Sequence, residues 1–313
     1  MVELNPVDAV EVTLVVDNFV DILLAGAEGV RRFPLAYDFF DHQQLVAEHG
    51  FSALVTVESG GRRSSILYDG GLTPKGLGNN LEVMEVDPIG LRAIVISHGH
   101  LDHHGGLEGL AARTGRRRLP LLIHPGAWRE RKLTFPTGAE LRLPPPSRAD
   151  LEAEGLEVVE ERGPTLLLEG QVLISGEVPR VSGFEIGFPI HQARAGGGWE
   201  PDPLILDDQN VIVEVAGKGL VVVSGCSHAG AINVLRNAQR LTGRDRIAGF
   251  VGGFHLTGAI FEPIIEPTIA AFAELGVERV VPGHCTGWKA THRLAQALPG
   301  AFVQPSVGTV VRF

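Results

Sequence analysis

The sequence carries a dense cluster of metal-binding residue types in the run SHGHLDHHGG, which begins at Ser97. His98 and His100 are separated by one residue, so in an extended chain their side chains leave the same face and can bind one metal ion. Asp102 and His103 follow where the chain turns into a helix, and they can reach a second ion close by. Ligand-type side chains at this density predict a metal site.

Three further histidines each follow an apolar, strand-like run. His228 ends the run LVVVSGCSH, His255 lies in FVGGFHL, and His284 lies in VVPGHCTG. Side chains that follow adjacent strands meet at one edge of a sheet, where open α/β sheets bind ligands. Two ions each need about three protein ligands with a position left for water, and these histidines complete that number.

The chemistry expected of such a site is hydrolytic. Two divalent ions a few ångströms apart lower the pKa of a shared water from 15.7 towards about 7, so hydroxide forms at neutral pH. The second ion can hold a substrate oxygen and stabilise the negative charge that develops on it. We expect Asp102 and His255 to be the catalytic residues, with Asp102 both binding metal and accepting a proton. The same machinery acts on esters, thioesters, lactones, lactams and phosphodiesters, so it leaves the substrate open.

The elements that position these residues follow from short apolar runs and the glycine, proline and aspartate residues that bound them. Expected strands are 10–16, 52–57, 64–68, 93–97, 119–124, 165–170, 171–176, 211–215, 220–225, 247–253 and 279–284. Expected helices are 39–48, 107–114, 231–241, 263–275 and 290–297. Antiparallel strands at the front and strand-helix alternation at the back predict an α/β fold.

The chain of 313 residues is expected to form a single domain, 1–313, with the segment 114–199 as an irregular insert. This segment holds the basic run 116–118, the prolines at 144–146 and the glycines at 196–198. It could serve as a lid over the site, as an oligomer contact, or as a plain surface excursion, which is the ordinary role of a short arginine run.

The charge balance predicts the kind of partner. With 27 Lys and Arg against 37 Asp and Glu, the net charge is -10, which argues against a nucleic acid or an anionic membrane and favours a small molecule. No apolar run approaches the roughly 18 residues of a membrane span, and the first residues lack the pattern of a signal peptide. Two cysteines cannot form a disulfide framework, which agrees with a reducing compartment. We therefore expect a cytoplasmic protein. Its chains could assemble into a homo-oligomer.

The motifs resemble those of a known family. HGHLDHHGG resembles the HxHxDH signature of the metallo-β-lactamase superfamily, and YDGG at 68–71 resembles the aspartate-bearing turn that precedes it there. Further pieces resemble the branch of 7,8-dihydropterin-6-methyl-4-(β-D-ribofuranosyl)aminobenzene-5'-phosphate synthases. These pieces are DNFVDILL, AEHGFSALV, ISGEVPR, DDQN, GCSHAGAINVL, GGFHL and HCTG, and they occur in order along nearly the whole chain.

The resemblance implies a four-layer αββα sandwich of mixed sheets with the metals at one sheet edge. It implies two groups of metal ligands: His98, His100 and His228 for the first ion, and Asp102, His103 and His284 for the second.

Cys226 stands where many members have an aspartate that bridges the two ions. Its thiolate can ligate metal, or it is a neutral core thiol while His255 or Asp207 does that work. His104 receives no metal role. Zinc is the expected metal, and imidazole with carboxylate also suits iron and manganese.

Two enzymatic functions and one binding function are compatible with these residues. The favoured one is a binuclear metal-dependent hydrolase that acts on a small phosphorylated or ester substrate by metal-bound hydroxide. The alternative is a dihydropterin alkyl transferase, in which an arylamine displaces diphosphate. Asn18, Arg180 and Lys289 are the candidate substrate-binding residues, and Trp199 and Trp288 are candidates for stacking on a ring. A non-catalytic binding module is the third function, and the complete set of ligands argues against it.

Overall fold

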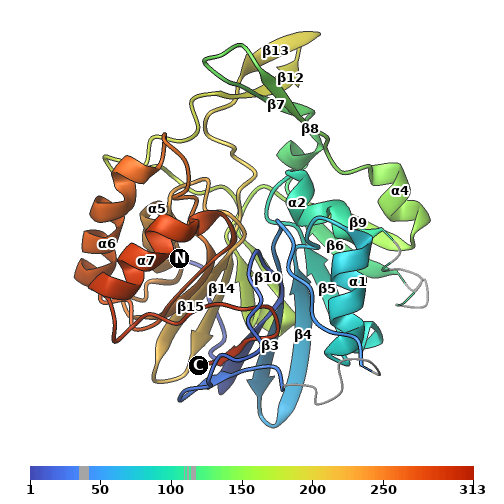
Figure 1. Ribbon diagram of the computed structural model, residues 1–313. Helices are drawn as coiled ribbons and strands as arrows, with labels where there is room; N and C mark the ends of the chain where they lie inside the picture. The colour runs from blue at the N-terminus through green and yellow to red at the C-terminus, as the bar shows by residue number, and fades with distance from the viewer. Residues whose placement is uncertain (35–41, 109, 111–112, 114–117) are drawn as a thin grey trace.

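Two β-sheets packed face to face form the centre of the protein, and helices cover the outer face of each (Figure 1). The computed structural model describes residues 1–34, 42–108, 110, 113 and 118–313. Helices α5, α6 and α7 lie on one side of the sheets in Figure 1, and α1, α2 and α4 lie on the other. The expected four-layer αββα sandwich is confirmed.

The first sheet has eight strands and mixed pairing. Its order is β2 (Val30–Arg31), β18 (Val310–Arg312), β1 (Ala9–Val16), β3 (Ser52–Ser59), β4 (Arg62–Tyr68), β5 (Leu91–Val95), β6 (Leu119–Ile123) and β9 (Leu156–Glu160). The strands from β2 to β4 in this order pair antiparallel, and β4, β5, β6 and β9 pair parallel. The parallel part therefore brings the carboxyl ends of β4 and β5 side by side.

The second sheet has six strands and is also mixed. Its order is β10 (Thr165–Leu167), β11 (Val172–Ile174), β14 (Val211–Val215), β15 (Gly219–Ser224), β16 (Ile247–Gly253) and β17 (Val280–Gly283). β15, β16 and β17 run parallel, with helices α5 and α6 as their crossovers. Parallel neighbours need such crossovers, which explains the strand-helix alternation in the second half of the sequence.

The main hydrophobic core lies between the two sheets. Val10, Val12 and Leu14 of β1 belong to it, whereas Val15 belongs to the core on the outer face of the same sheet. This division follows the two-residue period of a strand, by which alternate side chains point to opposite faces. Both faces of the sheet are apolar because both are covered.

The outer layers pack through amphipathic helices. α5 (Ala231–Thr242), α6 (Ile265–Glu274) and α7 (Trp288–Ala297) cover the six-stranded sheet, and α1 (Pro74–Val83), α2 (Leu101–His104) and α4 (Arg148–Ala153) lie beside the eight-stranded sheet. In α5 the buried residues Ile232, Leu235 and Ala238 repeat every three positions, as one face of a helix requires. The short 3-10 segments are Pro88–Gly90, Gly105–Leu107, Pro125–Trp128, Leu168–Gly170, Glu262–Ile264 and His284–Thr286.

The segment 114–199 is not irregular in its described part, 118–199. It supplies β6 and β9 to the first sheet and β10 and β11 to the second. It also supplies most of a separate antiparallel sheet in the order β13 (Gly198–Pro201), β12 (His191–Ala195), β7 (Arg131–Thr134) and β8 (Glu140–Leu143). Figure 1 shows this small sheet projecting beyond one end of the sandwich. That the segment 114–199 acts as a lid, and that residues 1–313 form a single domain, stay predictions.

The expected elements and the observed ones differ in a few places. The helices expected at 231–241, 263–275 and 290–297 are present. The helix expected at 39–48 is wrong for its described residues, 42–48, which form no helix. The helix expected at 107–114 and the arginine run at 116–118 lie largely outside the described residues. Within the described ranges, no helix combines the length and the apolar character that a membrane crossing demands.

Candidate metal centre

The histidines meet at one end of the sandwich because their strands end there together. His98 and His100 follow β5 of the eight-stranded sheet, and His228, His255 and His284 follow β15, β16 and β17 of the six-stranded sheet. The site therefore lies across both sheets, with ligand donors from each.

The first group of donors is made of His98, His100 and His228. The Nε2 atom of His98 lies 2.9 Å from Nδ1 of His100 and 3.1 Å from Nε2 of His228. All three residues are buried, and one donor atom from each lies within 4.8 Å of the others. Burial lowers the pKa of each of these imidazoles well below its usual value, with the neighbouring histidines adding to the shift. They are therefore neutral at pH 7, the form that binds metal.

The second group expected from the sequence is Asp102, His103 and His284, whereas the donors that lie within 4.8 Å of one another are those of Asp102, His284 and the exposed His49. Asp102 Oδ2 lies 3.2 Å from Nε2 of His284 and 3.8 Å from Nε2 of His103. Burial raises the pKa of Asp102, but the two histidines outweigh it and hold the pKa well below its usual value. His284 Nε2 is buried without a hydrogen-bond partner. Two imidazole rings and one carboxylate, with one ring nitrogen unsatisfied, form a donor set that fits divalent metal ions.

Asp69 positions His103, a role that the sequence motif YDGG did not assign. Its Oδ2 accepts a hydrogen bond of 2.6 Å from His103 Nδ1, and its two oxygens accept from the Ser97 backbone N–H and hydroxyl, each at 2.7 Å. Nε2 of His103 is thereby left free to face a metal. Burial would lower the pKa of His103, but Asp69 and Asp102 raise it to about 9. Asp69 itself has a left-handed φ of 62°, a conformation that structures retain mainly at functional sites.

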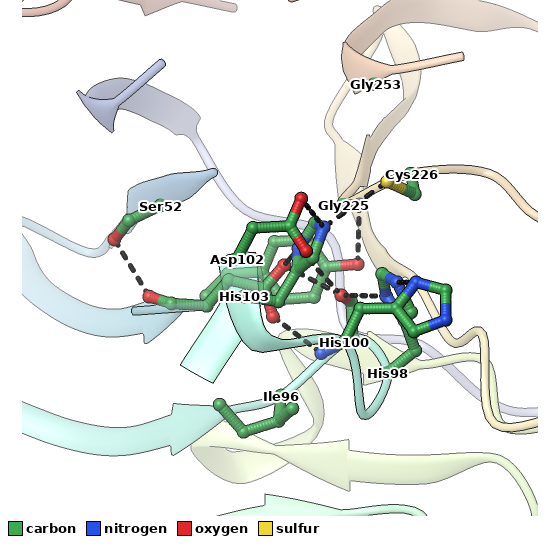
Figure 2. A network of polar contacts seen from close by, with 12 residues as sticks. Ser52, Ile96, His98, His100, Asp102, His103, Gly225, Cys226 and Gly253 are labelled. Carbon is green, nitrogen blue, oxygen red and sulfur yellow. Dashed lines mark hydrogen bonds and ion pairs between the residues drawn. The ribbon is translucent and has the colours of Figure 1, made fainter. Parts of the chain in front are cut away.

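Cys226 lies between the two groups. Figure 2 shows its sulfur facing the cluster that contains His98, His100, Asp102 and His103. Its Sγ atom is 3.3 Å from Nε2 of His103. It can form a metal-binding group with donors of the first set and another with donors of the second. Burial raises the pKa of the Cys226 thiol, and a bound cation would act in the opposite direction because the thiolate is the ligating form. Its place fits a bridging ligand.

Asp207 and His255 were the alternatives to Cys226. Asp207 Oδ2 accepts from the Gly99 N–H at 2.8 Å and pairs with Arg131 at 2.9 Å, so it braces the loop that carries the histidines. Among the described residues, no group able to hold a metal includes Asp207. The ring of His255 is tilted against that of His228, with ring centres 4.2 Å apart, and His255 can form a group with His228 and Cys226.

The candidate substrate-binding residues take different places. Asn18 accepts from Nδ1 of His284 through Oδ1 at 3.1 Å, which leaves Nε2 of that histidine for metal. Arg180 donates to backbone carbonyls, one of them that of Val178 at 2.5 Å, and Lys289 pairs with Glu262 at 2.6 Å. Neither Arg180 nor Lys289 lines the cavity over the metal centre.

Trp199 and Trp288 lie outside the cavity over the metal centre. Trp199 is on the small sheet, where the ammonium of Lys132 lies 4.8 Å from its ring centre. Trp288 is 76% exposed, and its ring is tilted against that of His292 with ring centres 4.1 Å apart. His104 is buried, and no possible metal group among the described residues includes it.

His191, which no sequence motif indicates, contacts the first group from the small sheet. His191 Nε2 lies 2.9 Å from Nε2 of His100, and its Nδ1 donates to the Asp202 carbonyl at 2.9 Å. Because His191 is neutral, its Nε2 accepts from His100, and Nδ1 of His100 faces the other ligands. His191 follows no long apolar run, so only the pairing of β12 with β7 brings it to the site.

A cavity of about 650 Å³ opens above the metal centre. Its floor includes His100, Asp102, His228 and His284, and it extends between the small sheet and the loop 257–261. Volumes of this size are typical of sites for small molecules. The ligand donors are thus accessible to a substrate.

A four-layer sandwich with two groups of metal-binding side chains at one end defines a metal-dependent enzyme fold of the α/β class. The family model described as the metallo-beta-lactamase superfamily matches residues 47–228, and the chain belongs to this superfamily. Its members are generally enzymes, hydrolases above all, that bind divalent metals.

Two relatives from Methanocaldococcus jannaschii match nearly the whole chain. One is the 7,8-dihydropterin-6-methyl-4-(beta-D-ribofuranosyl)-aminobenzene-5'-phosphate synthase, which is 29% identical over 93% of this chain and 99% of its own. The other, the uncharacterized protein MJ0448, is 28% identical over 86% of this chain and 95% of its own. Among solved structures, Tm1679, a metal-dependent hydrolase of the beta-lactamase superfamily, has a TM-score of 0.72 and 25% identity, covering 97% of this chain and 98% of its own.

Proposed function

We propose that the protein is a binuclear metal-dependent hydrolase that acts on a small ester or phosphorylated substrate. The observation that carries the proposal is a set of overlapping donor groups that share Cys226 and reach the floor of an open cavity. When bound there, two divalent ions, zinc in the first place and iron or manganese as alternatives, supply Lewis acidity and a water of lowered pKa.

Residues around that centre have separate roles in metal binding, proton transfer and orientation of the ligands. Asp102 holds metal and can accept a proton, since its low pKa keeps it ionised. His255 lines the cavity beside the first group and can exchange a proton with a substrate oxygen. Asp69, Asn18 and the backbone around them orient the ligating imidazoles.

The test is metal content together with turnover. Protein purified without a metal-binding tag is analysed by plasma mass spectrometry, and the same sample is assayed with bis(p-nitrophenyl) phosphate and p-nitrophenyl acetate. We expect two ions per chain and turnover of at least one probe. The variant His100→Ala should lose metal and activity together, whereas His292→Ala, an exposed histidine on α7, should keep both. Full metal content and activity in His100→Ala would contradict the site assignment.

A synthase of the dihydropterin type is the second candidate. It is favoured by the relative of that name, which is 29% identical over 93% of this chain and 99% of its own length. In this reaction an arylamine would displace diphosphate from a dihydropterin, so neither substrate alone would react. We expect a transferase to stay silent with ester probes and to release diphosphate only when both cosubstrates are present.

We also propose that a small molecule, and neither a nucleic acid nor a membrane, is the partner of the site. The net charge of -10 supports this proposal, since it disfavours polyanionic surfaces.

A further inference from the structure

The cavity over the metal centre is mostly apolar above its floor. One wall comes from the small sheet and its hairpin, and the opposite wall comes from the loop 257–261. The large apolar side chains of these walls are Leu133, Phe135, Leu141, Leu143, Ile260 and Phe261. A ligand that contacts the metal-binding floor must therefore pass its remaining atoms between apolar surfaces.

Several of these wall residues are exposed although they are large and apolar. Phe135 is 38% exposed, Leu141 50% and Ile260 42%, and they lie on both sides of the same cavity. Exposed apolar side chains gathered around a site mark the place where a ligand binds, unlike single ones scattered over a surface. The small sheet is fixed to the metal centre through His191 and His100, so the wall and the floor form one site.

The walls supply little positive charge. Among the described residues that line the cavity, Arg142 is the only lysine or arginine. Its guanidinium donates to Glu130 at 2.9 Å and lies over the Trp199 ring at 4.9 Å. A phosphate group of a substrate, placed between these walls, would find few cationic partners. An uncharged apolar group would leave no charge unpaired when it is buried there.

We infer that the substrate is an uncharged carboxylic ester or thioester with an apolar acyl group. Its carbonyl would lie on the metal-binding floor, and its acyl group between the small sheet and the loop 257–261. In the reaction, water oxygen bonds to the carbonyl carbon, the bond to the alcohol oxygen or thiol sulfur breaks, and the leaving group takes a proton. The products are a carboxylic acid and an alcohol or thiol. This inference rests on the proposed hydrolase function and narrows its substrate.

The first test measures binding without turnover. Straight-chain hydroxamic acids from two to eight carbons, whose head group chelates metal, are titrated calorimetrically into the zinc-loaded protein. We expect the affinity to rise about threefold to fourfold for each added methylene that the walls bury. An affinity that does not change with chain length would overturn the inference.

A matched pair of variants locates the binding surface. Leu141→Gln places an amide on the cavity wall, while Leu166→Gln makes the same change on β10, where Leu166 is 42% exposed and does not line this cavity. We expect the gain per methylene to shrink in Leu141→Gln and to be retained in Leu166→Gln. Equal gains in both variants would place the acyl group elsewhere.

The second test separates the substrate class from the enzymatic function. The kcat/KM values for p-nitrophenyl esters from acetate to octanoate are compared, and we expect them to rise with acyl length by a factor similar to that for binding. If all the esters react at equal kcat/KM, the hydrolase function stands and the apolar class is wrong. If hydroxamate affinity rises but no ester reacts, the acyl site stands and the hydrolase function is wrong.

Discussion

His100 is held on both sides by other imidazoles, and this arrangement decides which of its nitrogens meets a metal. Burial, with Arg131 nearby, lowers the pKa of His191 to about 4, so His191 is neutral at pH 7. Its Nδ1–H donates to the Asp202 carbonyl, which leaves Nε2 as an acceptor for His100. A residue on the small sheet therefore positions a metal ligand on the loop after β5.

Replacement of His191 tests this positioning. In His191→Leu the acceptor is lost, and we expect the affinity of the first site for zinc to fall about 10-fold to 100-fold, as is usual when such a partner is removed. His191→Gln offers a carbonyl oxygen in its place and should restore most of the affinity. Zinc affinity is measured by competition with a chromophoric chelator. Equal affinities in the wild type and both variants would exclude a positioning role.

Replacement of Cys226 tests whether this cysteine is a metal ligand. If its thiolate lies between the two ions, Cys226→Ala should bind fewer than two ions per chain under conditions that saturate the wild type. His292→Ala is the control, because His292 is exposed on α7 and belongs to no possible metal group among the described residues. Metal content by plasma mass spectrometry decides the matter, and two ions per chain in Cys226→Ala would remove this cysteine from the ligand set.

The first turn of helix α5 contacts the buried carboxylate of Glu185. Glu185 accepts hydrogen bonds from the N–H groups of Ile232 and Asn233, at 2.8 and 2.9 Å, in the first turn of the helix. Such a carboxylate satisfies free N–H groups and the positive end of the helix dipole. Burial nevertheless raises the pKa of Glu185 from its usual 4.5 to about 7, so its charged form carries a cost in the folded state.

The stability contributed by Glu185 should therefore fall with rising pH. A pKa raised on folding means that the folded state binds the proton more tightly, so the contribution is complete below about pH 4.5 and is lost as the pH rises to about 7. We expect the free energy of unfolding of the wild type, minus that of Glu185→Gln, to decrease by about 1 to 3 kcal/mol between pH 4.5 and 8. Urea denaturation of both proteins across this range measures the difference. A difference that is constant or increases with pH would show that this carboxyl has no raised pKa.

The elements that sequence analysis anticipated are those with a strong local signal. The apolar run before His98 and the runs before His228 and His284 are buried strands, and their ends place the histidines as expected. α1 was missed because its sequence, PKGLGNNLEV, contains glycines and asparagines, which have low helix propensity.

The small sheet was missed for a different reason. Its strands, such as RKLT in β7 and HQARA in β12, are short, largely polar and joined across the sequence. Their pairing is set by tertiary contacts, which also bring His191 to His100. The cavity wall and its apolar lining depend on this sheet, so neither could be derived from the order of residues.

At the scale of the whole molecule, the metal centre joins the two sheets. His98 and His100 lie on the loop after β5 of the first sheet and His103 on α2, which follows it, while His228 and His284 follow strands of the second sheet. Ions bound there would connect halves of the chain that are more than a hundred residues apart. Because folding alone assembles this set of ligands, the free energy of metal binding contributes to the free energy of folding.

Removal of metal should therefore lower the stability of the entire sandwich. Each site filled at a free zinc concentration 100 times its Kd adds about 2.7 kcal/mol to the free energy of unfolding. We expect the chelated protein to have a lower Tm than the zinc-loaded protein, and added zinc to restore it. The Tm of His100→Ala should respond less to zinc, while that of His292→Ala should respond as the wild type does. If chelation removed both ions and left the Tm of the wild type unchanged, the centre would not connect the sheets energetically. The unfolding of each sheet would then be governed by the apolar core between them alone.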